Sequence, residues 1–192
     1  MSMSRQENTN AAVRFLEGER VFLRPIGTED TELYFRSLFN KETRMLTGTQ
    51  KHFTREQIHQ YIANKGQDSS SVLLLICLRE NDQVIGDVQI GHIDPNNRNA
   101  FIRISIDQSA YQGKGYGSEA LLLMLDYGFG ILNLHRIELN VFAFNERAIH
   151  TYEKLGFQRE GVQRQALYYN HAYHDSILMS MLADEYRAKY LK

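Results

Sequence analysis

Three alternating glycines occur in a ten-residue segment, positions 111–120, whose sequence is YQGKGYGSEA. The segment lies between a run typical of a β-strand and an apolar run typical of a helix. Glycine lets the backbone come close to a ligand and direct successive N–H groups toward it. The helix that follows adds the positive end of its dipole and further unpaired donors. The segment therefore predicts a binding site for a phosphate or a pyrophosphate.

Two common nucleotide sites do not match this turn. A P-loop needs Gly-Lys followed by Ser or Thr, but Lys114 is followed by Gly115. The dinucleotide-binding pattern needs two residues between its second and third glycines, whereas only Tyr116 separates Gly115 from Gly117. The sequence therefore disfavours both a P-loop and a dinucleotide-binding turn.

A second segment, positions 145–157, has the sequence NERAIHTYEKLGF. Together the two segments resemble the GNAT acetyltransferases. The stretch QGKGYG at 112–117 is similar to their Gln/Arg-x-x-Gly-x-Gly/Ala signature. The second segment is similar to their Asn-x-x-Ala/Ser-x-x-x-Tyr/hydrophobic-x-Lys-x-Gly-Phe pattern. The resemblance extends from about residue 20 to 185. Its later part is similar to the branch containing ribosomal-protein N-terminal acetyltransferases and spermidine N-acetyltransferases.

The resemblance implies a set of contacts with coenzyme A. Backbone N–H groups of the turn would bind its pyrophosphate: Gln112, Gly113, Lys114, Gly115, Tyr116, Gly117 and Ser118. The pantetheine arm would pair with backbone groups freed where the third strand of the central sheet separates from its neighbour: Ile104, Ser105 and Ile106. Asn145 and Lys154 complete the set, although Asn145 is also suited to simple helix capping.

Tyr152 is the candidate general acid, since the resemblance implies that it protonates the departing thiolate. An alternative is plain packing. Ala148, Ile149, Tyr152 and Leu155 fall on one apolar face of the expected helix.

The acceptor amine needs to lose a proton, because an alkyl ammonium with a pKa near 10 cannot attack a thioester. Many relatives place a Glu on the third strand, where this sequence has Phe101. Glu138 and Asp87, on neighbouring strands, are the candidate bases. A base is dispensable if the acceptor is an α-amine, which is already partly neutral.

No pair of histidines has convincing metal-ligand spacing. His171 and His174 are three residues apart on an expected strand, which turns them to opposite faces. We therefore predict no metal site.

Alternating or apolar β-type runs predict strands near 20–26, 72–78, 84–90, 100–107, 137–142, 157–163 and 172–181. Helices are expected near 28–39, 54–65, 115–130 and 145–156. Residues 1–13 are expected to be a flexible tail and residues 14–192 a single domain. The resemblance implies a mixed α/β GNAT fold: a mostly antiparallel seven-stranded sheet with a splayed parallel pair, flanked by about four helices.

The composition gives no support for binding to nucleic acid or to a membrane. The 192 residues include 22 Lys plus Arg and 23 Asp plus Glu, so no overall charge favours nucleic acid or an anionic membrane. The start of the sequence lacks the apolar stretch of a signal peptide. Cys77, the single cysteine, lies in an apolar run and is expected to be buried. A soluble cytoplasmic protein is expected.

The sequence thus predicts an N-acetyltransferase that uses acetyl-coenzyme A as cosubstrate and acts by direct transfer to a primary amine. The acceptor would be a protein N-terminus, a polyamine or another small amine. The alternative is a non-catalytic module that binds coenzyme A as a sensor or scaffold. A monomer or homodimer is expected.

Overall fold

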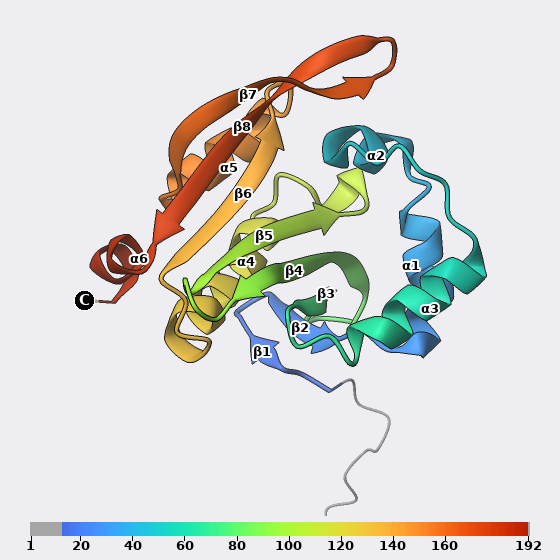
Figure 1. Ribbon diagram of the computed structural model, residues 1–192. Coiled ribbons are helices and arrows are strands. Elements are labelled where there is room, and N and C mark those ends of the chain that lie inside the picture. The colour runs from blue at the N-terminus through green and yellow to red at the C-terminus, as the bar shows by residue number, and fades with distance from the viewer. Residues whose placement is uncertain (1–12, 192) are drawn as a thin grey trace, which may run out of the picture.

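The computed structural model describes residues 13–191, which form an open sheet with helices against both of its faces (Figure 1). The predicted tail, 1–13, lies outside the described residues except for Val13. The strand order is β1-β2-β3-β4-β5-β6-β8-β7. Every neighbouring pair is antiparallel except β5–β6, which is parallel. The predicted mixed α/β architecture is therefore confirmed.

The sheet has eight strands in the described chain: β1 (Leu16–Glu17), β2 (Val21–Pro25), β3 (Val72–Leu78), β4 (Val84–Asp94), β5 (Asn99–Ile106), β6 (Arg136–Phe142), β7 (Gln158–Tyr169) and β8 (Ala172–Leu182). Seven were expected, and the additional one is β1, which pairs with β2. Two residues are too few to show the alternation that identifies a strand in a sequence.

Six α-helices are found in residues 13–191: α1 (Thr31–Ser37), α2 (Lys41–Thr47), α3 (Arg55–Lys65), α4 (Tyr116–Asp126), α5 (Glu146–Leu155) and α6 (Ala183–Tyr190). The sequence predicts about four, without α2 and α6. Helix α2 is held by its caps, since the Asn40 side chain accepts the Thr43 N–H and Gly48 ends the helix at φ +65°. Such short helices lack the long apolar period on which the expectation rested.

The parallel pair β5–β6 separates soon after it begins. Only Asn99, Ala100 and Phe101 of β5 have partners on β6, whereas β5 runs on to Ile106 alongside β4 alone. The predicted splay is therefore present. In the described part of the chain, the second half of β5 therefore has no paired strand on the side facing β6, and we call this break in strand pairing the opening (Figure 1).

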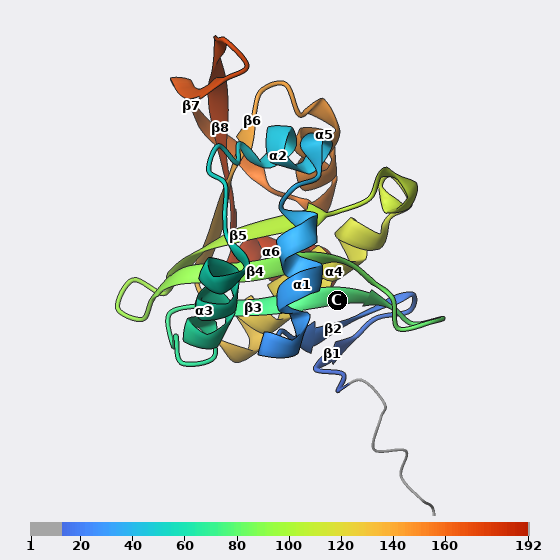
Figure 2. The ribbon, with the colours of Figure 1, turned by 90° about the vertical axis from the view of Figure 1, so that its right-hand side faces the viewer.

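Helices cover opposite faces of the sheet around this opening (Figure 2). Helix α4 packs on the face that carries Ile104 and Ile106, both close to Gly117. Helices α1 and α3 pack on the other face, where Tyr34 joins Leu75 in a second core cluster. Each fully buried aliphatic side chain in these clusters stabilises the fold by about 1.5–3 kcal/mol. Strand β5 contributes to the first cluster through Ala100 and Ile102, with Ile104 and Ile106 packed against it, so this cluster fixes β5 beneath α4.

Candidate active site

The glycine turn presents a row of unpaired backbone donors. The N–H groups of residues 113 to 118 donate to no group of the described chain. Gly113 and Gly115 have φ values of +72° and +86°, a region that glycine adopts without the penalty of a Cβ. Because α4 begins at Tyr116, the last three donors also lie at the positive end of its dipole. This arrangement fits the phosphates of coenzyme A.

Arg20, immediately before β2, stabilises the turn through hydrogen bonds. Its Nη1 donates to the carbonyl of Lys114 at 2.9 Å, and its Nε donates to Glu119 of α4 at 3.1 Å. The guanidinium also stacks over the Tyr116 ring, 5.1 Å from the ring centre. Sequence reasoning missed this role, because nothing local to Arg20 indicates a partner almost a hundred residues away.

The register of β5 decides which backbone groups face the opening. The Asp107 N–H donates to the Ile85 carbonyl, and Ile106 lies opposite Gly86. Since N–H and C=O groups of successive residues point to opposite sides of a strand, those of Ile104 and Ile106 point away from β4, into the opening. The backbone of Ser105 instead faces β4. Of the three predicted arm contacts, two are oriented for that role and Ser105 is not.

The amide side chains of the two motifs have mixed roles. Gln112 donates through Nε2 to the Ile106 carbonyl at 2.9 Å, so it links the turn to the end of β5. Asn145 caps α5, where its Oδ1 accepts the Ala148 N–H at 3.3 Å, and its Nδ2 has no partner among the described residues. Lys114 and Lys154 are exposed. Capping by Asn145 is therefore observed, while its predicted contact with coenzyme A stays a prediction.

Tyr152 lies on the buried face of α5. Its residue surface is 9% exposed, and its ring meets Phe157 edge-on at 5.8 Å. It belongs to the core cluster against which Ile104 and Ile106 pack. Burial raises the pKa of Tyr152 to about 12. Its hydroxyl makes no hydrogen bond to any residue of 13–191, so the proton is retained and not committed to a partner.

A cavity of about 60 Å³ lies on the opposite face of β5, beneath α1 and α2. Most of the residues that line it are of polar types: Tyr34, Ser37, Leu38, Thr43, Arg44, Thr47, Thr49, Asp87, Arg103, Ser105 and Asp107. The residues come from two helices, two strands and the loops that follow them. A cavity at this position is suited to a small polar group that approaches the opening from the side away from α4.

The two predicted bases lie in different surroundings. Asp87 lines the cavity, is 6% exposed and accepts a hydrogen bond from Arg103 Nη1 at 2.9 Å. Glu138 lies beside Phe101 across the parallel pair and outside the cavity lining. Its carboxylate accepts two hydrogen bonds from Arg136, at 2.9 and 3.0 Å. The structure therefore brings only Asp87 of the two to the cavity.

Asp107 is a cavity carboxylate that sequence reasoning missed. It directly follows β5, and its one side-chain hydrogen bond is from Ser105 Oγ at 3.2 Å. Burial, and secondarily the charge of Asp87, raises the pKa of Asp107 to about 7. A signal was present in the sequence. Isoleucines alternate along β5 at positions 102, 104 and 106, so Arg103, Ser105 and Asp107 fall on the other, polar face.

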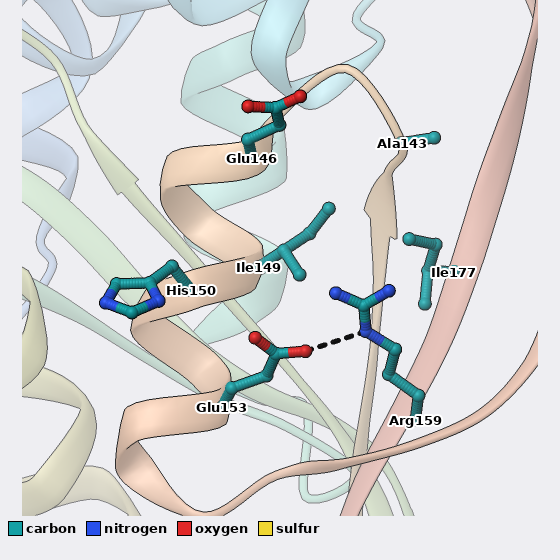
Figure 3. Close-up of a pocket in the computed structure, with 7 residues that line it drawn as sticks. All are labelled: Ala143, Glu146, Ile149, His150, Glu153, Arg159 and Ile177. Atoms are coloured by element: carbon teal, nitrogen blue, oxygen red, sulfur yellow. Dashed lines mark hydrogen bonds and ion pairs between the residues drawn. The ribbon is translucent and has the colours of Figure 1, made fainter.

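A larger hollow of about 380 Å³ lies beside α5 and contains none of the predicted site residues (Figure 3). Ile149 and Ile177 supply its apolar side. Its rim carries an ion pair in which Arg159 Nε lies 2.7 Å from Glu153 Oε1. Glu146 and His150 also line the hollow, but neither the glycine turn nor β5 contributes to it.

Within residues 13–191, no group of three or more His, Cys, Asp or Glu side chains is arranged to hold a metal ion. The same residues include no helix long and apolar enough to cross a membrane.

Comparison with known proteins gives a consistent result. Residues 20–158 match the family model described as an acetyltransferase (GNAT) domain. The chain is 33% identical over 172 residues to the spermidine N(1)-acetyltransferase of Escherichia coli K12, covering 88% of this chain and 90% of that protein.

Two solved structures from Vibrio cholerae are similar over nearly their whole length. One is spermidine N-acetyltransferase in complex with CoA and spermine, with a TM-score of 0.83 and 26% identity, covering 88% of this chain and 99% of that one. The other is a dodecameric form of spermidine N-acetyltransferase, with a TM-score of 0.79 and 25% identity, covering 90% and 99%.

Proposed function

Because the chain belongs to the GNAT family of acetyltransferases, we propose that it moves an acetyl group from acetyl-coenzyme A to a polyamine or a similar small amine. The observation that carries this proposal is the glycine turn. Its free N–H groups from 113 to 118 stand next to the opening beside β5, so one extended cosubstrate can reach both. Acetyl-coenzyme A supplies the acetyl group as a thioester.

Different residues of the chain bind the cosubstrate, align it and transfer a proton. The turn binds the pyrophosphate, and the backbone groups of Ile104 and the N–H of Ile106 align the pantetheine arm in the opening, while the Ile106 carbonyl accepts the Gln112 amide. A backbone N–H there also polarises the thioester carbonyl as charge develops on its oxygen. Tyr152 donates its proton to sulfur while the C–S bond breaks. Asn145 and Lys154 add contacts at the ends of α5.

Direct transfer to the amine is favoured over a covalent acyl-enzyme. The cysteine nucleophile that such an intermediate would use is missing from the site, since Cys77 is fully buried in the cluster under α1 and α3. Burial also raises the pKa of the Cys77 thiol, which disfavours the reactive thiolate.

The acceptor class is supported by both the cavity and the relatives. Two carboxylates and two arginines line the cavity, and Asp107 is the carboxylate that neither arginine pairs with, which suits a cationic amine. The E. coli and V. cholerae relatives are named for spermidine. A peptide N-terminus is the second candidate. The expected monomer or homodimer stays a prediction, which light scattering would test against the dodecamer of one V. cholerae structure. The expected cytoplasmic location also stays a prediction.

The test is thiol release from acetyl-coenzyme A across a panel of spermidine, spermine, N-terminal peptides and aminoglycosides. We expect turnover with a polyamine, and mass spectrometry of the product should show a single added acetyl group. Calorimetry with coenzyme A accompanies the assay. Tight binding of coenzyme A without turnover on any amine would contradict the proposal and favour the non-catalytic sensor.

A further inference from the structure

Asp107 and Asp87 share one cavity but differ in their partners. Each side-chain nitrogen of Arg103 has a partner: the residue donates to Asp87 at 2.9 Å, to Gln89 at 2.9 Å and to the Tyr34 hydroxyl at 3.1 Å. Asp107 has only the Ser105 hydroxyl, at 3.2 Å. The cavity therefore holds one carboxylate that is paired with a cation and one that is not.

The second arginine of the cavity lining is also occupied. Arg44 Nη1 donates to the Leu38 carbonyl at 3.1 Å, and Nη2 donates to the Gln50 carbonyl at 3.3 Å. It therefore ties α2 to its flanking loops and does not pair with Asp107. The position beside Asp107 is open to a cation from outside the chain.

An unsatisfied hydroxyl in the same cavity points to a ligand independently. Thr43 of α2 lines the cavity and is 8% exposed. Its Oγ1 is the one buried side-chain nitrogen or oxygen in the described chain without a hydrogen-bond partner. Such a group costs about 1–3 kcal/mol unless something binds it. The cavity volume, about 60 Å³, is that of roughly two water molecules and admits an ammonium group.

We propose that the Asp107 carboxylate binds the acceptor's ammonium group in this cavity and takes the proton that the nitrogen must lose before it attacks. The inference rests on the proposed acetyltransferase function. The position of Asp107 in the chain supports this role, because Asp107 directly follows Ile106, whose backbone faces the opening. The cavity and the glycine turn lie on opposite faces of β5, so amine and thioester approach each other through the opening.

The proton balance is complete. An N–H bond of the ammonium breaks, and the proton passes to the Asp107 carboxylate, which leaves a neutral amine. Nitrogen then forms the new C–N bond, and the C–S bond breaks as sulfur takes the Tyr152 proton. The second proton lost by nitrogen returns to the Tyr152 oxygen, and Asp107 releases its own proton to water. The products are the acetamide, the thiol and one proton.

The electrostatic surroundings suit this role. The charged and titratable groups that line the cavity around Asp107 are Asp87 of β4, Arg103 of β5, Tyr34 of α1 and Arg44 of α2. Burial and Asp87 together hold the pKa of Asp107 near 7, closer to that of an alkyl ammonium than an ordinary aspartate is. A base with a pKa near the working pH transfers protons effectively.

The decisive experiment is the pH dependence of kcat/KM for wild type, Asp107→Asn and the control Asp184→Asn, whose exposed side chain lies on α6. Wild type should lose activity as pH falls through about 7. Asp107→Asn should be slower by about a hundredfold at pH 7.5 and should recover toward pH 10, where the amine is neutral in solution. Asp107→Glu should restore part of the rate.

Thermal unfolding of the same variants gives a second readout. The raised pKa means that the folded state binds more protons than the unfolded state between about pH 4 and 7, so this group lowers stability as pH rises through that window. The melting temperature of Asp107→Asn should therefore be a few degrees above that of wild type at pH 8. At pH 4 the two melting temperatures should be about equal.

The outcomes separate the two proposals. Wild-type turnover with an unchanged Asp107→Asn profile would overturn the role of Asp107 and leave the acetyltransferase function standing. A loss of rate that is the same at every pH, or weaker coenzyme A binding, would make Asp107 structural and also overturn the inference. No wild-type turnover on any amine would overturn both.

Discussion

At the scale of single residues, Tyr152 has the properties that a proton donor needs. Its ring is packed in the core, its pKa of about 12 keeps it protonated at neutral pH, and its hydroxyl has no partner within residues 13–191. Delivering the proton to sulfur therefore breaks no existing hydrogen bond. The ring alone, through Phe157 and the core cluster, contributes to packing.

Tyr152→Phe separates the two roles. Because the ring is kept and the hydroxyl is unpaired, the free energy of unfolding should change by less than about 0.5 kcal/mol. The turnover number should fall by about a hundredfold or more, with the affinity for coenzyme A unchanged. Tyr127→Phe, at the end of α4, is the matched control for loss of a phenol. Equal turnover in wild type and Tyr152→Phe would leave Tyr152 with packing alone.

Some of the site could be predicted from single residues and some could not. The turn and Tyr152 belong to local motifs, so their types and spacing are visible in the sequence. Thr43 and Asp107 line the same cavity only because α2 folds over β5, and no local sequence pattern indicates that arrangement. Arg20 is similar, since its bonds to Glu119 span the whole first half of the chain.

At the scale of elements, the strand–turn–helix unit from β5 to α4 forms the binding site for phosphate. Its two left-handed glycines serve different purposes. A Cβ on Gly115 would approach Arg20 Nη2 to 2.9 Å, whereas one on Gly113 would meet nothing within 4 Å. A substitution at Gly113 therefore tests backbone conformation without a steric clash.

Gly113→Ala should weaken coenzyme A binding by about tenfold, because the left-handed conformation costs an alanine about 1–2 kcal/mol. The backbone then relaxes and turns its N–H groups away from the pyrophosphate. Isothermal titration with coenzyme A measures the effect. The control is Gly130→Ala, also an open position but without a positive φ, which should bind as wild type does. Equal affinity in all three proteins would remove the turn from the binding site.

Helices and strands could be predicted where a regular pattern of apolar residues continues over a long segment. The expected strands near β3 to β8 and the helices α3, α4 and α5 all appear. Most of them bury an apolar face, whereas β7 is almost entirely exposed and is held by its pairing with β8. The seven-residue helix α2 depends instead on its caps and on tertiary contacts, such as the ion pair of Glu42 with Arg147 at 4.0 Å. The acceptor side of the site was correspondingly the harder part to predict.

At the scale of the whole molecule, the sheet consists of two parts joined by three residue pairs of β5 and β6. The segment around α2 spans the gap between them, where Gln50 Nε2 donates to the Tyr168 carbonyl of β7 at 2.6 Å. The opening is thus bounded by the turn on one face and by the cavity on the other. Two substrates can occupy it together and react directly.

The most direct test of this account is the initial rate of thiol release with acetyl-coenzyme A and spermidine varied together. Direct transfer in a ternary complex predicts double-reciprocal lines that intersect, with no thiol released before the amine is added. Parallel lines, with a burst of thiol in the absence of amine, would indicate an acyl-enzyme. That result would contradict the arrangement in which amine and thioester meet in the opening beside β5.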